Sequence, residues 1–150
     1  MIVRQATLLD LLSLAPLADL YAQEAKGHDE FTVDLEHCLS NAAMTIMSDD
    51  GCFLVAYEGN QPVGFLWGYA MSMPWSKKKV AFDNLLYTIP AKRNGKAGVM
   101  LMKEWESWAK ERGAVAVQIS IASGIHEEKT ISFYKKMGYS YIGTQLRKEC

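Results

Sequence analysis

The segment from residue 79 to residue 113 constrains the fold more than any other part of the sequence. Lys79 to Thr88 is rich in apolar and aromatic residues and predicts a β-strand, which ends at Ile89-Pro90 because proline cannot continue a hydrogen-bonded ladder. A short loop containing glycine follows, and Asn94 to Arg112 has the apolar spacing of a long helix that Gly113 ends. A strand, a glycine-containing loop and a helix in direct succession indicate a domain that mixes helices and strands.

The remaining elements fit around this segment. Thr7 and Asp10 have the spacing of a capping box and predict a helix from about residue 8 to Gly27, in which Pro16 should cause a kink or a break. The other expected elements are an N-terminal strand, a second helix that Thr32 caps and that stops before Asp49, strands over 52–57, 63–71, 115–121 and 139–146, and a short helix over 131–137.

Composition limits the class of protein. The chain has 150 residues, of which 49% are apolar and 22% charged, so we expect one globular domain over residues 1–150. A formal net charge of −1 lacks the excess of Lys and Arg that a general nucleic-acid or membrane-surface role needs. The three cysteines show no paired spacing and indicate a reducing compartment. With no leader-like or membrane-length apolar stretch, we expect a soluble cytoplasmic protein without nucleic-acid or membrane partners.

The loop before the long helix has the chemistry of a phosphate site. A helix N-terminus presents unpaired backbone N–H groups and a partial positive charge, which together bind groups such as a pyrophosphate. Gly95 and Gly98 allow close approach, while Arg93 and Lys96 add positive charge. The same residues also fit an ordinary helix start with solvated basic side chains.

The whole chain resembles the GNAT family of acyl-CoA N-acyltransferases, best across residues 82–139. In that family an Arg/Gln-x-x-Gly-x-Gly/Ala loop follows a strand and a proline-containing turn; here Arg93 and Gly98 fit, whereas Lys96 occupies the first glycine position. The resemblance implies a GNAT fold of the α/β (α+β) class, with a mixed, mostly antiparallel twisted sheet of six to seven strands and about four helices. It also implies transfer of an acyl group, most readily acetyl from acetyl-CoA, to a primary amine in a ternary complex without a metal.

The resemblance assigns the coenzyme A contacts to two groups of residues. The backbone at the end of the strand is expected to pair with the pantetheine arm and to polarise the thioester carbonyl. The loop and helix start are expected to bind the pyrophosphate. The residues concerned are Leu86, Thr88 and Ile89 in the strand, and Arg93, Asn94, Gly95, Lys96, Ala97 and Gly98 in the loop.

Residues 130–139 provide the second part of the resemblance. They look like the family's helix that ends in Tyr-x-x-x-Gly-Phe/Tyr, and Tyr134 matches the tyrosine that protonates the departing thiolate. A positioned phenol is suited to that step because the leaving thiolate needs a proton or a hydrogen bond. Core packing of Tyr134 is the alternative. Glu127 stands where the family often has an asparagine.

An attacking amine must be neutral, so the reaction needs a general base near the acceptor. Asp83 is the only carboxylate in the strand before the loop, and Asn84 could orient a water molecule. Strict alternation places Asp83 on one face with Leu85 and Tyr87, and Asn84 on the opposite face. A solvent-facing residue at a strand position is the alternative for Asp83.

The sequence leaves the acceptor amine unspecified. Trp67, Tyr69, Met71, Met73 and Trp75 could line an acceptor pocket, and core packing explains the strand positions equally well. The three histidines have no metal-ligand spacing. A homodimer is compatible with the family. The alternative function is a catalytically inactive acyl-CoA-binding or protein-interaction module on the same fold.

Overall fold

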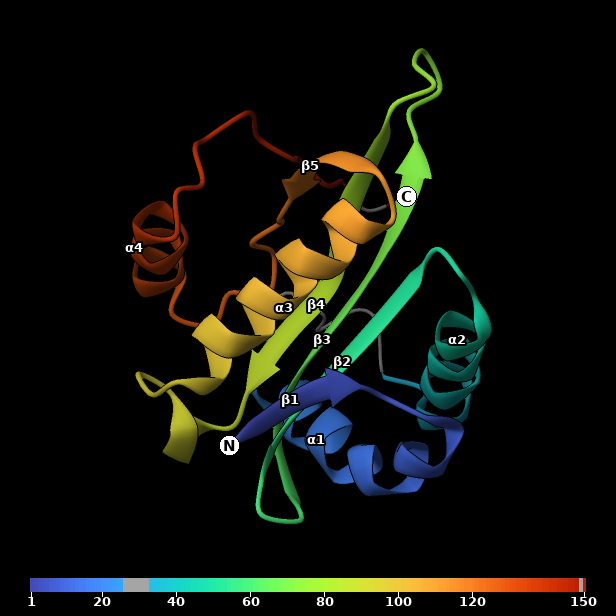
Figure 1. Ribbon diagram of the computed structural model, residues 1–150. Helices are drawn as coiled ribbons and strands as arrows, with labels where there is room; N and C mark the ends of the chain where they lie inside the picture. Colours follow the sequence, from blue (N-terminus) through green and yellow to red (C-terminus); the bar gives the residue numbers. More distant parts are fainter. Residues whose placement is uncertain (26–32, 149) are drawn as a thin grey trace.

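The computed structural model describes residues 1–25, 33–148 and 150. Its centre is a five-stranded sheet in the order β1-β2-β3-β4-β5 (Figure 1). Neighbouring strands are antiparallel from β1 to β4, and β5 runs parallel to β4. The strands are β1 (Ile2–Gln5), β2 (Gly51–Glu58), β3 (Gln61–Ser72), β4 (Lys79–Thr88) and β5 (Ala114–Gln118). The predicted mixed, mostly antiparallel sheet is confirmed, and β4 has the predicted bounds.

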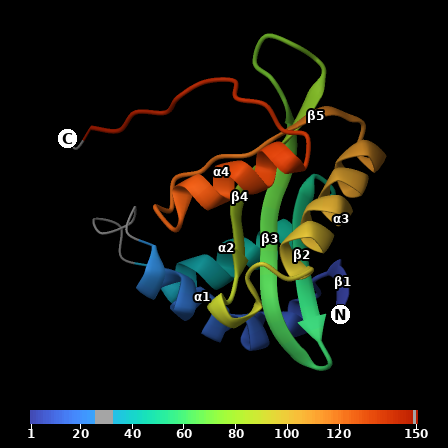
Figure 2. The same ribbon diagram turned by 90° about the vertical axis from the view of Figure 1, so that its left-hand side faces the viewer.

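Helices cover both faces of the sheet. The helices α1 (Leu11–Glu24) and α2 (Leu35–Met47) lie on one face, and α3 (Ala97–Glu111) and α4 (Glu127–Lys136) lie on the other (Figures 1 and 2). Each layer encloses its own apolar cluster, because the buried residues of α1 and α2 pack with one set of sheet residues and those of α3 and α4 with the other. The helix after β4 (α3) and the helix carrying Tyr134 (α4) therefore lie on the same side of the sheet.

Two strand predictions were wrong. Residues 139–146 form no strand, and the described chain has five strands in its sheet rather than six or seven. Tyr141, Ile142 and Leu146 are 73–93% exposed, so their apolar side chains have no layer on which to pack. The predicted strand over 115–121 is shorter, because β5 stops pairing with β4 at Gln118.

The N-terminal helices begin and end differently from the prediction. The Thr7–Asp10 capping box is present, but a short 3-10 turn over Leu8–Asp10 precedes α1, and α1 continues through Pro16. It ends at Glu24, and the predicted end at Gly27 and cap at Thr32 lie outside the described residues. The described cap of α2 is the Asp34 carboxylate, which accepts a hydrogen bond from the His37 backbone N–H at 2.9 Å.

A glycine in β3 allows the core beneath α3 to close. A Cβ atom at Gly68 would stand 2.7 Å from the Phe82 carbonyl oxygen and 3.3 Å from Trp105 Nε1. Trp105 is fully buried in the cluster between α3 and the sheet. Only glycine at position 68 leaves room for this indole against the sheet.

Candidate active site

The sheet opens between β4 and β5. These two strands pair only over Lys79–Phe82 and Ala114–Gln118, whereas β3 stays paired with β4 as far as Thr88. The second half of β4 therefore has one edge without a strand partner among the described residues. A strand edge of this kind presents backbone N–H and C=O groups that an extended ligand can pair with.

The register fixes which backbone groups face this open edge. The Ile89 N–H donates to the Val63 carbonyl in β3 at 3.0 Å. In an antiparallel pair, every second residue makes such bonds, so the main-chain groups of Leu86 and Thr88 point away from β3 toward the open edge. Leu86 and Thr88 therefore lie at the open edge, while the Ile89 N–H is already used within the sheet. Their contact with the pantetheine arm stays a prediction.

A β-bulge at Asn84 interrupts the alternation of β4. Trp67 of β3 lies opposite Leu85 and Gly68 lies opposite Asp83, so Asn84 is the extra residue. Leu86 packs with the α3 cluster, whereas Leu85 packs with the cluster of α1 and α2. The predicted faces were therefore wrong: Asp83 shares a face with Leu86, and Asn84 lies on the opposite face, together with Leu85.

Asp83 stands where β4 and β5 part. Its Oδ1 accepts hydrogen bonds from the backbone N–H of Ser120 at 2.8 Å and from the Ser120 hydroxyl at 3.4 Å. Burial raises the pKa of Asp83 to about 6, although the bonds from Ser120 act in the opposite direction. A carboxylate with this pKa is ionised at neutral pH. Its pKa is also close enough to neutral pH for the group to act as a general base.

Tyr134 lies on the α3 side of the opening. Its side chain is 7% exposed, and its ring packs against Phe133 and Tyr139 with centroids 5.4 and 5.9 Å away. Burial, and then the negative charge of Asp83, raise the pKa of Tyr134 above its ordinary value. The phenol therefore stays protonated at neutral pH and is able to donate a proton. Both roles considered for Tyr134 from the sequence, core aromatic and acid, are compatible with this position.

The loop at the start of α3 is a tight turn. Asn94 has a left-handed backbone with φ of 64°, and α3 begins at Ala97 rather than at Asn94. Lys96 is the N-cap residue and is exposed. A Cβ atom at Gly98 would lie 3.7 Å from the ring of Phe133, so the first turn of α3 stands beside α4. This turn lies on the same side of the sheet as Tyr134, and its first N–H groups have no partner within the helix.

The Arg93 side chain is held within the protein. Its two terminal nitrogens donate to the Glu24 carboxylate at 2.7 and 2.8 Å, and its Nε donates to the Thr88 carbonyl at 2.9 Å. Its guanidinium also lies 5.5 Å from the centre of the Tyr87 ring. Hydrogen bonds from Arg93, opposed by burial, lower the pKa of Glu24.

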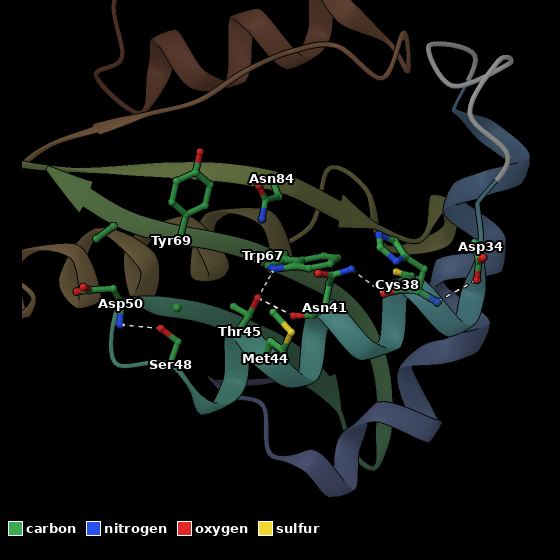
Figure 3. A pocket seen from close by; sticks show the side chains of 13 residues that line it. Asp34, Cys38, Asn41, Met44, Thr45, Ser48, Asp50, Trp67, Tyr69 and Asn84 are labelled. Carbon is green, nitrogen blue, oxygen red and sulfur yellow. Dashed lines mark hydrogen bonds between the residues drawn. The ribbon is translucent and has the colours of Figure 1, made fainter. Parts of the chain in front are cut away.

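A groove of about 670 Å³ lies on the other face, between α2 and strands β3 and β4 (Figure 3). Asn84 reaches into it from the bulge, and Trp67 and Tyr69 line it from β3. The Trp67 indole N–H donates to the Thr45 hydroxyl at 2.8 Å, which fixes one wall of the groove to α2. Trp67 and Tyr69 thus line a pocket as predicted, whereas Trp75 is 80% exposed in the loop after β3.

Sequence reasoning missed two residues of this site. Glu24 ends α1 and is 69 positions from Arg93, and Ser120 follows β5. Glu24 stands three residues after Tyr21, on the stripe of α1 that faces the core, and a carboxylate in such a stripe is a signal for a buried cationic partner. For Ser120 no local pattern distinguishes it from an ordinary strand end.

Within residues 1–25, 33–148 and 150, no three His, Cys, Asp or Glu side chains gather as metal ligands would. Over the same ranges, no helix combines the length and the apolar character of a membrane span.

Comparison with known proteins agrees with this geometry. A curated N-acetyltransferase of Bacillus subtilis, the uncharacterized YhfO, is 25% identical over 137 residues, which cover 91% of this chain and 88% of YhfO. The structure of a ribosomal-protein-alanine N-acetyltransferase from Brucella melitensis superposes with a TM-score of 0.76 at 17% identity and covers 100% of both chains. An aminoglycoside acetyltransferase from an uncultured soil metagenomic sample superposes with a TM-score of 0.73 at 19% identity, covering 99% of this chain and 97% of its own.

The family match spans most of the sequence. Residues 12–139 fit the family described as the acetyltransferase (GNAT) family. This range includes the open edge of β4, the start of α3 and the helix carrying Tyr134, and the fold that the similar structures share is the one found here. The chain therefore belongs to the acetyltransferase (GNAT) family.

Proposed function

We propose that this protein transfers an acyl group, most readily acetyl, from coenzyme A to a primary amine within a ternary complex. The observation that carries the proposal is the parting of β4 and β5 at Asp83, with Tyr134 on one side and the Asn84-lined groove on the other. The opening thus offers separate approaches for a donor and an acceptor. Family membership supports the same donor chemistry.

The donor would bind along the open edge of β4. The pantetheine amides pair with the main-chain groups of Leu86 and with the Thr88 N–H, since the Thr88 carbonyl already accepts a hydrogen bond from Arg93. The pyrophosphate binds at the first turn of α3, near Gly98. This places the thioester near Asp83. Coenzyme A supplies the activated acyl group as a co-substrate, and the protein binds, orients and moves protons around it.

The reaction then consists of one attack and two proton movements. The neutral amine attacks the thioester carbonyl carbon, the new C–N bond forms, and the C–S bond breaks to leave the coenzyme A thiolate. Asp83 accepts the proton that the amine nitrogen loses, directly or through a water molecule, and Tyr134 donates a proton to the thiolate sulfur. Proton exchange with solvent restores both side chains.

The acceptor would reach the thioester from the α2 face. The groove between α2 and β3–β4 contains amide and hydroxyl groups from Asn41, Thr45 and Asn84 beside the rings of Trp67 and Tyr69. Such a surface suits an amine that also carries hydrogen-bonding groups. The cytoplasmic location and the homodimer stay predictions.

Calorimetric titration of the purified chain tests the proposal. We expect saturable binding of acetyl-CoA, and we would compare it with free coenzyme A and a longer acyl-CoA. Thiol release would then be screened with a panel of amines that begins with an aminoglycoside and an alanine-initiated peptide. These two come first because similar structures include an aminoglycoside acetyltransferase and a ribosomal-protein-alanine N-acetyltransferase. Absence of binding to every acyl-CoA would overturn the proposal. Binding without thiol release across the panel would favour the non-catalytic acyl-CoA-binding module.

A further inference from the structure

Three basic residues stand between the end of β4 and the start of α3. Lys92 forms an ion pair with Glu58, and Arg93 forms an ion pair with Glu24. Lys96 is exposed and has no ion-pair partner within the part of the chain that the structure describes. The three cations are therefore not equivalent toward an incoming anion, although all three lie in the same loop.

The pair between Arg93 and Glu24 is the most constrained of these contacts. Both terminal nitrogens of the guanidinium face both carboxylate oxygens, and only 22% and 27% of the two side chains are exposed. Tyr87, which is 3% exposed, donates its hydroxyl hydrogen to the same carboxylate at 2.5 Å. A bidentate pair with a third hydrogen bond in a half-buried setting is rigid, and releasing Arg93 would leave Glu24 without its countercharge.

The same guanidinium also holds the end of β4. Its Nε donates to the Thr88 carbonyl at 2.9 Å, on the edge of β4 that faces away from β3. Because Nε and both terminal nitrogens are engaged at once, Arg93 fixes the position of Thr88 relative to the end of α1. We call this set of contacts among Glu24, Tyr87, Thr88 and Arg93 the α1–β4 strut.

We propose that Arg93 is a positioning residue, which Glu24 holds so that the α1–β4 strut sets the open edge of β4, and that Lys96 provides the positive side chain for the phosphates. This assignment rests on the proposed function. It differs from the sequence prediction that Arg93 binds the pyrophosphate, because the charge of Arg93 is already paired with Glu24 within the protein. Lys96 occupies the N-cap position of α3 without a side-chain capping hydrogen bond, next to the N–H groups of the first turn.

A comparison of two donors separates the two roles. Acetyl-CoA carries the phosphates, whereas acetyl-pantetheine has the same thioester and arm without any phosphate. The Lys96→Gln variant should bind acetyl-CoA about tenfold more weakly and acetyl-pantetheine as well as the wild type does, because one charge-assisted contact is lost. Lys103→Gln, which removes an exposed lysine from the middle of α3, is the matched control and should bind both donors normally.

The variants Arg93→Gln and Glu24→Gln test the strut. Each variant should lower the affinity for both donors by the same factor, roughly tenfold. The reason is that the edge of β4 loses its fixed position whichever of the two charged residues is replaced. The double variant should bind no worse than either single variant. The exchange of the two charges, Glu24→Arg with Arg93→Glu, should recover part of the loss if the fold tolerates it, and thermal unfolding of every variant checks that the fold is kept.

Two patterns would contradict the assignment. If Arg93→Gln lowered only the affinity for acetyl-CoA, and Glu24→Gln left that affinity unchanged, Arg93 would contact the phosphates directly. If Lys96→Gln bound acetyl-CoA normally, Lys96 would not be the phosphate cation. If the wild-type chain bound neither donor, both the proposed function and the role assigned to Lys96 would be wrong. In that case the free energies of unfolding of the two single variants and the double variant would still test the strut. Non-additive changes would support it, and additive changes would contradict it.

Discussion

At the scale of single residues, Tyr134 and Asp83 have complementary protonation states. Burial keeps the phenol of Tyr134 protonated, and Asp83 is ionised above a pKa of about 6. A proton donor and a proton acceptor are therefore present together at neutral pH. The two residues come from different elements, since Asp83 belongs to β4 and Tyr134 to α4.

Replacement of Tyr134 by phenylalanine isolates the proton that the ring donates. We expect the kcat of Tyr134→Phe to fall about 100-fold with any amine that the wild type accepts, because general acid assistance to the thiolate is lost. The affinity for acetyl-CoA and the thermal midpoint should hardly change, since the ring still fills its place beside Phe133. A kcat equal to that of the wild type, measured with the fold intact, would remove Tyr134 from the mechanism.

Asp83 predicts a specific dependence on pH. The kcat/KM should fall as the pH drops below about 6, where Asp83 becomes protonated, and Asp83→Asn should lose that limb of the profile together with most of the activity. Because burial raises this pKa from 3.8 to about 6, the folded state holds the proton more tightly than the unfolded chain. Its contribution to stability is therefore present below about pH 3.8 and is lost as the pH rises through about 6.

The same substitution thus separates activity from stability. At pH 7.5 Asp83→Asn should raise the thermal midpoint, because it removes the cost of a buried charge while its side-chain oxygen still accepts the Ser120 N–H. Scanning calorimetry at pH 4 and pH 7.5 checks the sign: the gain should be larger at the higher pH. A lower midpoint at both values would show that the ionised carboxylate stabilises the fold.

At the scale of elements, the start of α3 combines two requirements. The chain must turn tightly after β4 and must leave the first helical N–H groups accessible, and Gly98 belongs to this turn. A Cβ atom at position 98 meets only ordinary contact distance to Phe133, so a side chain there is accommodated by the protein. A side chain at position 98 would instead occupy space beyond the N-terminus of α3, where the phosphates are proposed to bind.

Gly98→Glu tests this point. An acidic side chain in the first turn of a helix is favourable for the helix itself, so the thermal midpoint should stay the same or rise. The affinity for acetyl-CoA should fall by roughly tenfold or more, because the carboxylate repels the phosphates and occupies their space. Gly98→Ala is the matched control and should bind with a smaller loss. Equal affinity for the glutamate variant and the wild type, measured by calorimetry, would place the phosphates elsewhere.

Elements with a strong local signal were predictable from the sequence, and local irregularities were not. The bounds of β4 followed from its apolar run and from Pro90, because each is a local signal. The bulge at Asn84 has no such signal: it adds one residue to a strand without changing its composition, and it reversed the predicted faces. The strand expected over 139–146 failed for a related reason, since alternation predicts a strand only when a neighbour exists to pair with it.

At the scale of the whole molecule, Asp10 ties the N-terminal elements to the sheet. Its carboxylate is 9% exposed and accepts hydrogen bonds from Arg4 of β1, from the Tyr57 hydroxyl of β2, and from the backbone and side chain of Thr7. Hydrogen bonds from Arg4 lower the pKa of Asp10 below its ordinary value. Sequence spacing indicated the contact with Thr7 but not the contacts with Arg4 and Tyr57, which depend on the folded arrangement of β1 and β2.

Asp10→Ala should destabilise the molecule by about 2 kcal/mol, because it removes the charged acceptor that the Arg4 and Tyr57 groups share, while the exposure of Arg4 to solvent limits the loss. Chemical denaturation with a fitted midpoint and slope measures this loss. The stabilising effect of the ionised Asp10 is present above its ordinary pKa and is lost as the pH falls below it, so the difference between the variant and the wild type should shrink in acid. A difference that did not change with pH would argue against the charge as its cause.

The open edge of β4 also bears on how such a protein can diverge. The groups of Leu86 and Thr88 that face the edge are main-chain groups, which every substitution except one by proline retains. The groove beside α2 is instead lined by side chains such as those of Asn41, Trp67 and Asn84. Under the proposed function, most mutations would therefore change the acceptor surface without altering the donor edge. A lineage built on this sheet would then acquire new amine substrates one residue at a time and keep the same acyl donor throughout.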